Sequence, residues 1–169
     1  MRTVKMAGTA LALGILAAAC GSGGSDGGAA SATPAAAPSS PPASAAAGAA
    51  AAVDARKAGL GTILVDGKGM TLYLFEKDKG GKSSCDGACA SAWPPVLTTG
   101  KAMPGPGVTA SLLGTTTRSD GTTQVTYNHW LLYYYAADKV PGDTTGQDID
   151  AFGAEWYVLD AAKGTKLEK

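Results

Sequence analysis

The chain has 169 residues, of which 45% are hydrophobic and 17% charged, and 14 Lys and Arg balance 14 Asp and Glu. A formal net charge of zero provides no basic face for a phosphate backbone, so we predict no nucleic-acid partner. The chain has three cysteines, and an odd number leaves at least one outside any intramolecular pair.

The N-terminus has the pattern of an export signal. Arg2 and Lys5 precede an apolar stretch, 6–19, which is too short to span a hydrocarbon core of ~30 Å as a helix. Three alanines then lead to Cys20, a pattern that resembles the lipobox of bacterial lipoproteins, although Leu16 lies one position early. The resemblance implies cleavage before Cys20 and lipidation of its thiol. An ordinary secretory signal with an incidental cysteine is the alternative.

The segment that follows consists almost entirely of Gly, Ser, Ala, Pro and Thr, with one charge at Asp26. Without large apolar side chains it cannot bury enough surface to offset the entropy of ordering. We therefore divide the chain into a signal peptide, 1–19, a lipidated and disordered tether, 20–52, and a globular domain, 53–169.

The globular domain is rich in strand signals and has no long stretch of helical periodicity. A turn at 66–69 joins 62–65 to 70–75 as a hairpin, and a turn at 119–121 joins 112–118 to 122–127 as a second. The further expected strands are 130–135, 155–159 and 165–168. We predict a mostly β fold, a single antiparallel β domain.

The domain contains an internal duplication. Leu64–Asp78 aligns with Gln124–Asp138, 60 positions later, and both copies contain Tyr-x-aromatic-x-x-Asp. Each copy is followed by a Gly-rich loop and then by a tryptophan that opens an apolar run. Two copies at so long an offset indicate two pseudo-repeated halves, about 58–100 and 112–160, that share one core.

These motifs resemble the bacterial secreted-repeat lipoproteins of unknown function. The resemblance rests on the duplicated motif, on Cys85-Asp86-Gly87-Ala88-Cys89-Ala90 before Trp93-Pro94-Pro95, and on the run from Asp138 to Gln147. It departs at His129 and Leu131, where the family has a small residue and a proline. The resemblance implies an exported lipoprotein module and brings no established activity.

The aromatic and acidic residues of the duplicated motif, with the two following tryptophans, have two interpretations. Alternate strand residues point to the same face, so the rings form either a shared core or an aromatic binding surface with aspartates at its edge. The aspartates could instead hydrogen-bond loop amides as turn formers. The candidate binding surface consists of Tyr73, Phe75, Asp78, Trp93, Tyr133, Tyr135, Asp138 and Trp156.

Cys85 and Cys89 are expected to form a disulfide in an oxidising compartment. A redox-active pair is an alternative, although the spacing is not Cys-x-x-Cys. A haem or copper site is another, in which His129 with Met70 or Met103 would complete a copper ligand set.

The acidic loop after the second motif contains Asp138, Asp143, Asp148 and Asp150, and oxygen-rich loops can hold Ca²⁺. Its spacing differs from that of an EF-hand, and a solvated polar loop is the other interpretation. The chain has no nucleophile elbow, no His-Glu-x-x-His and no phosphate loop. We therefore predict that the protein is not an enzyme.

Together these features predict a lipoprotein attached to the cell membrane on its extracytoplasmic side through lipid on Cys20. We expect a non-catalytic binding module without a cofactor, whose partner is a ligand or protein of the cell envelope. The alternative is an envelope redox or metal-handling protein that uses Cys85 and Cys89.

Overall fold

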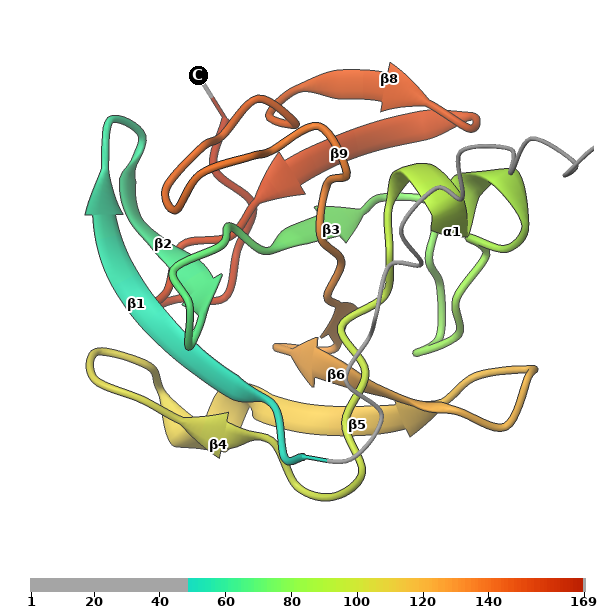
Figure 1. The fold of residues 1–169 in the computed structure, drawn as a ribbon, viewed down its shortest axis with the longest axis horizontal. Coiled ribbons are helices and arrows are strands. Elements are labelled where there is room, and N and C mark those ends of the chain that lie inside the picture. The colour runs from blue at the N-terminus through green and yellow to red at the C-terminus, as the bar shows by residue number, and fades with distance from the viewer. Residues whose placement is uncertain (1–48, 169) are drawn as a thin grey trace, which may run out of the picture. The chain divides into compact units, whose positions relative to one another are not determined.

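The computed structural model describes residues 49–168 (Figure 1). The predicted signal peptide, Cys20 and nearly all of the predicted tether lie outside the described residues. Across residues 49–168, no helix combines the length and the apolar character that crossing a lipid bilayer requires.

Residues 49–168 form nine short strands, one α-helix and one turn of 3-10 helix at Ala110–Leu112. The helix is α1 (Ala88–Ala92). The strands are β1 (Ala52–Ala58), β2 (Gly61–Asp66), β3 (Tyr73–Phe75), β4 (Met103–Pro104), β5 (Leu113–Thr117), β6 (Thr123–Tyr127), β7 (Trp130–Leu131), β8 (Ile149–Ala151) and β9 (Ala154–Val158).

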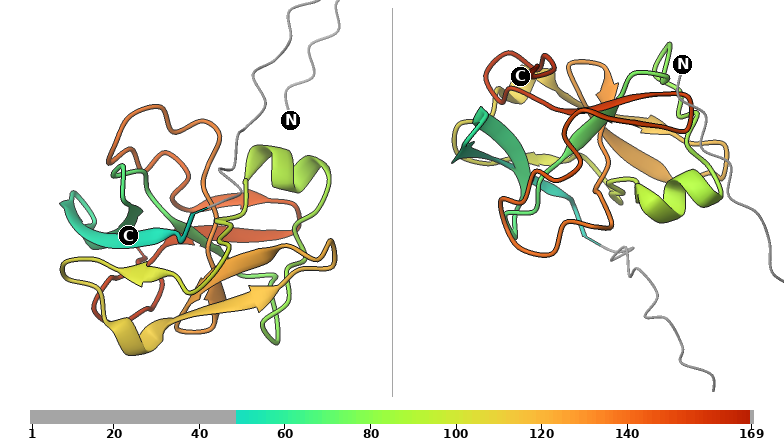
Figure 2. Two further views of the ribbon diagram at one scale, coloured as in Figure 1. Left: turned by 60° about the horizontal axis from the view of Figure 1, so that its bottom comes forward. Right: turned by 90° about the horizontal axis from the view of Figure 1, so that it is seen from above.

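The strands form three three-stranded sheets, ordered β2-β1-β4, β3-β9-β8 and β5-β6-β7. Every strand pair is antiparallel apart from the short parallel contact between β1 and β4. Figures 1 and 2 show the sheets around a common interior, with β1 and β2, β8 and β9, and β5 and β6 on three different sides. The structure confirms the predicted mostly β, largely antiparallel fold.

Strand β3 runs between two hydrophobic clusters, because its successive side chains point to opposite faces. Leu72 and Leu74 lie in one cluster with Val125, whereas Tyr73 and Phe75 lie in the other. A strand that is apolar on both faces is thus central to the domain.

The first predicted hairpin, which joined 62–65 to 70–75, forms its turn at 66–69, but the predicted strand pairing beyond that turn is wrong. Asp66 closes that turn by accepting bonds from the amides of Lys68 and Met70, both at 2.9 Å. Pairing with β2 then ends at the single bridge between Val65 and Thr71. Strand β3 instead pairs with β9, which brings its aromatic residues against those of the second half.

The sequence prediction missed β1, β4, β8, helix α1 and the 3-10 turn. Strand β1 directly follows the low-complexity segment and pairs with β2 from Val53 to Ala58. Strand β8 falls within the predicted acidic loop and pairs with β9. Helix α1 has only five residues, fewer than a pattern of helical period needs to become visible.

Candidate functional site

The two copies of the repeated motif exchange partners at the centre of the domain. The Tyr73 hydroxyl donates to Asp138 of the second half at 2.6 Å, and the Tyr133 hydroxyl donates to Asp78 of the first half at 2.6 Å. The backbones of the two tyrosines also pair with each other, through N–H to carbonyl bonds of 2.8 and 2.9 Å. Each tyrosine therefore binds the aspartate of the opposite copy.

The second oxygen of each aspartate fixes the loop that follows its own motif. Asp78 accepts from the amide and hydroxyl of Ser84, at 2.7 and 2.8 Å. Asp138 accepts from the amide and hydroxyl of Thr145 in the same way. The aspartates are only 5% and 7% exposed, so both oxygens of each are occupied within the fold.

The aromatic rings also connect the two halves, because four rings form one stack in which residues of the first and second half alternate. Phe75 of the first half lies on Trp156 of the second at 4.0 Å between centroids, and Tyr135 of the second half lies on Trp93 of the first at 4.1 Å. The two tryptophans stack on each other at 4.0 Å. Neither half could complete the stack alone.

The predicted binding surface requires a correction. Seven of its eight side chains are buried, and Tyr135 is partly buried. A ligand has no access to rings that are packed against one another, so the alternative interpretation as a shared core describes them. The aspartates likewise bind loop amides, as expected of turn formers.

Gly146 shows how closely the second loop packs on this core. A Cβ atom at this position would lie 2.8 Å from the Trp93 ring and 3.0 Å from the Tyr73 ring. The Gly146 amide also donates to the Tyr73 hydroxyl at 3.3 Å. Only a residue without a side chain lets the loop approach the rings so closely.

The first loop is held differently, by a disulfide between Cys85 and Cys89 whose Cα atoms are 5.2 Å apart. Helix α1 begins next to this bond, and the Cys89 carbonyl accepts from the Trp93 amide at 2.7 Å. The cysteines are 0% and 5% exposed. A partner thiol or reductant has little access to sulfurs buried in this way.

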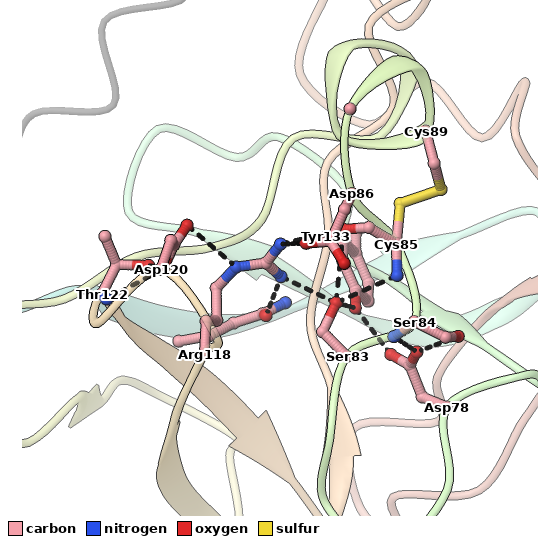
Figure 3. A network of polar contacts seen from close by, with 12 residues as sticks. Asp78, Ser83, Ser84, Cys85, Asp86, Cys89, Arg118, Asp120, Thr122 and Tyr133 are labelled. Carbon is pink, nitrogen blue, oxygen red and sulfur yellow. Dashed lines mark hydrogen bonds and ion pairs between the residues drawn. A yellow bond between two sulfur atoms is a disulfide. The ribbon is translucent and has the colours of Figure 1, made fainter.

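Arg118 is a site residue that the sequence analysis missed, and Figure 3 shows it at the centre of a polar network. Its side chain is only 2% exposed. One terminal nitrogen donates to Ser83 at 2.8 Å and Gln124 at 2.7 Å, and the other donates to the Cys85 carbonyl at 2.8 Å and Asp86 at 3.1 Å. The guanidinium thereby attaches the β5–β6 hairpin to the disulfide loop.

The network continues from Arg118 to the tyrosine–aspartate pair (Figure 3). The Ser83 hydroxyl lies 2.8 Å from the Tyr133 hydroxyl, which itself donates to Asp78. Asp120, in the turn after β5, lies 3.6 Å from the Arg118 Nε atom. An arginine beside a Ser-Asp-Gly turn looks solvent-exposed in the sequence, and only the long-range fold shows its burial.

Burial and the partner aspartates both favour the neutral phenols. Burial, with the hydrogen bond to Asp138 as a second cause, raises the pKa of Tyr73 far above its ordinary value. Burial and the bond to Asp78 raise the pKa of Tyr133 in the same direction. The unfolded chain ionises these groups near pH 10, whereas the folded chain keeps them protonated.

We predict a steep loss of stability above about pH 10. Above this pH the unfolded state binds fewer protons than the folded state, so the free energy of unfolding falls by up to ~1.4 kcal/mol per pH unit for each such tyrosine. The contribution is complete below pH 10 and is lost as the pH rises toward the folded pKa. Urea unfolding between pH 9 and 11.5 measures the slope, which Tyr73→Phe should reduce; an unchanged slope would contradict this assignment.

The residues considered for metal binding are not brought together. Cys85 and Cys89 bond to each other, and His129 lies exposed in the turn between β6 and β7. In the acidic loop, Asp138 turns inward to Tyr73, while Asp143 accepts from the amides of Lys139 and Val140 at 2.8 and 3.0 Å. Those two amides lower the pKa of Asp143. Residues 49–168 contain no group of three or more His, Cys, Asp or Glu placed to hold a metal ion.

The fold and its centre define a class of duplicated β domain, in which two repeats exchange a tyrosine–aspartate pair and an aromatic stack. The chain belongs to the family described as a secreted repeat of unknown function, whose profile matches residues 55–97 and 114–160. The predicted resemblance to a secreted-repeat family is thereby confirmed, and an extracytoplasmic location fits it. No curated protein and no solved structure matches the chain.

Proposed function

We propose that this protein is a lipid-anchored binding module of the cell envelope, displayed on the extracytoplasmic side of the membrane and acting without catalysis. The description of the family as secreted supports the location. The run of alanines before Cys20, after a short apolar segment, supports the anchor. The segment 20–52, which is rich in alanine, glycine, serine and proline, would connect the domain to that anchor.

The exchange of partners between the two halves is the observation that carries the non-catalytic part of the proposal. A general acid or base must reach a proton on its substrate. Asp78 and Asp138 instead bind a buried tyrosine through one oxygen and a loop through the other. The most distinctive residues of the repeat therefore serve the architecture, and contact with a partner falls to the surface around them.

The geometry favours this function over a redox or metal-handling role. Reactive cysteines are accessible and lie in environments that favour the thiolate. Cys85 and Cys89 are bonded and buried, and the Cys85 carbonyl holds the Arg118 guanidinium. The disulfide thus fixes a loop that the core depends on.

One experiment tests the anchor and the binding role together, with the full chain and Cys20→Ala produced in a bacterial host fed an alkyne fatty acid. Wild type should carry the label and collect with the membranes. Cys20→Ala should be exported without label, because Ala17-Ala18-Ala19 still provides a small-residue cleavage site. A wild-type chain without label would contradict the anchor.

The released Cys20→Ala chain then serves as immobilised bait for fractionated envelope material. A binding module should retain a component and return it with unchanged mass on elution. Conversion of a component into a product of different mass, dependent on the folded chain, would contradict the non-catalytic role.

A further inference from the structure

An open cleft lies between the loop that follows the first motif and the sheet of β5, β6 and β7. Its volume is about 700 Å³, within the range of roughly 300–1,000 Å³ typical of small-molecule sites. A hollow beside the start of β1 measures about 380 Å³ by comparison. Residues 78–81 line the loop side of the cleft, and Thr115, Thr116, Thr126 and Trp130 line the sheet side.

The loop side of the cleft is held in place before any ligand arrives. Asp78 is fixed by Tyr133 and Ser84 at the base of the loop. The Thr116 hydroxyl donates to the Gly81 carbonyl at 2.8 Å, which attaches the tip of the loop to β5. Gly80 and Gly81 have no atom within 4 Å of a Cβ position, so the loop wall stays open at the tip.

The opposite side is the two-residue turn of Asn128 and His129, and both residues have positive φ, at 47° and 68°. Such a turn favours Asn followed by Gly, because a side chain with positive φ at the second position is strained. Asn128 is held by its side-chain amide, which donates to the Gly164 carbonyl at 3.1 Å. His129 carries the strain and places an exposed imidazole on the cleft.

Trp130 provides the aromatic part of this wall. Of the three tryptophans in the chain, Trp93 and Trp156 are buried at 1% and 0% exposure, whereas Trp130 is partly exposed and lines the cleft. An indole offers a large apolar face together with a hydrogen-bonding edge. The other lining residues include three threonines, His129 and Lys79, whose side chains are able to donate or accept hydrogen bonds.

We propose that this cleft binds a glycan, with one sugar ring against Trp130 and its hydroxyl groups on His129, Lys79 and the threonines. A sugar ring combines an apolar face of C–H groups with a rim of hydroxyls, and this combination matches the cleft wall. The inference rests on the proposed binding function and names its site and ligand class.

The test uses the full-length chain carrying Cys20→Ala with chitotetraose, cellotetraose and maltotetraose as probes. Acrylamide quenching reports chiefly on Trp130, because the other two tryptophans are buried. We expect saturable protection from quenching by at least one of the three probes. His129→Gly should weaken that affinity about tenfold, the loss expected for one well-formed hydrogen bond, without loss of stability.

The matched control is Phe152→Gly, which relieves positive φ in the β8–β9 turn, outside the cleft. It should leave the affinity within about twofold of wild type, since distant surface changes are usually small. Absence of protection by all three probes, or equal affinity of His129→Gly and wild type, would overturn the glycan site. If the bait still retains an envelope component in that case, the binding function stands; if it retains nothing, both fall.

Discussion

Trp156→Ala should reduce the free energy of unfolding by about 3–5 kcal/mol, the range for removing a large aromatic side chain from a core. Trp156 is fully buried and stacks between Phe75 and Trp93. Its ring also makes a T-shaped contact with the Tyr133 ring, with 5.2 Å between the ring centroids. Because a domain of this size is stable by only ~5–15 kcal/mol, such a loss would leave the variant close to unfolding. Urea unfolding followed by far-ultraviolet circular dichroism measures the change.

Two further variants distinguish the stability that comes from ring stacking from the general effect of shortening an aromatic side chain. Trp156→Phe keeps a flat ring between its neighbours and should lose less than half as much stability. Phe152→Ala removes an exposed aromatic ring from the same hairpin and should stay within about 0.5 kcal/mol of wild type. A Trp156→Ala variant as stable as Phe152→Ala would show that the stack does not hold the halves together.

Asp138→Ala has the second large expected effect, a loss of about 3 kcal/mol. The change leaves the buried Tyr73 hydroxyl and the Thr145 amide without their acceptor. Leaving a buried polar group unpaired costs ~1–3 kcal/mol, and bonds to a charged acceptor lie at the upper end. Chemical unfolding at neutral pH gives the measurement.

The control for this prediction is Asp150→Ala, which removes an exposed carboxylate from β8 in the same half. Its effect should stay within ~0.5 kcal/mol of wild type. Equal losses for the two variants would contradict a structural role for Asp138. Asp78→Ala should match Asp138→Ala, since Asp78 accepts the equivalent bonds in the first half.

Much of the fold followed from local patterns in the sequence. The segment 70–75 was predicted to be a strand, and β3 occupies its second half. The hairpin of β5 and β6 followed from its Ser-Asp-Gly turn. The duplication at an offset of 60 indicated a shared core, since neither half could bury its rings alone.

Other features depend on contacts between distant residues, which a local pattern does not encode. Nothing in the spacing of the motif says that Tyr73 binds Asp138 rather than the nearby Asp78. The burial of Arg118 arises because the disulfide loop folds over the end of β5. The first hairpin prediction failed for the same reason: β3 gains more from ring contacts with β9 than from continued pairing with β2.

A pair of double-mutant cycles tests the exchange between halves most directly. Tyr73→Phe combined with Asp138→Asn should show a coupling energy of about 1–2 kcal/mol, because the two groups share a hydrogen bond. Tyr73→Phe combined with Asp78→Asn should be additive within ~0.5 kcal/mol. Strong coupling within one half and additivity across the halves would contradict the account.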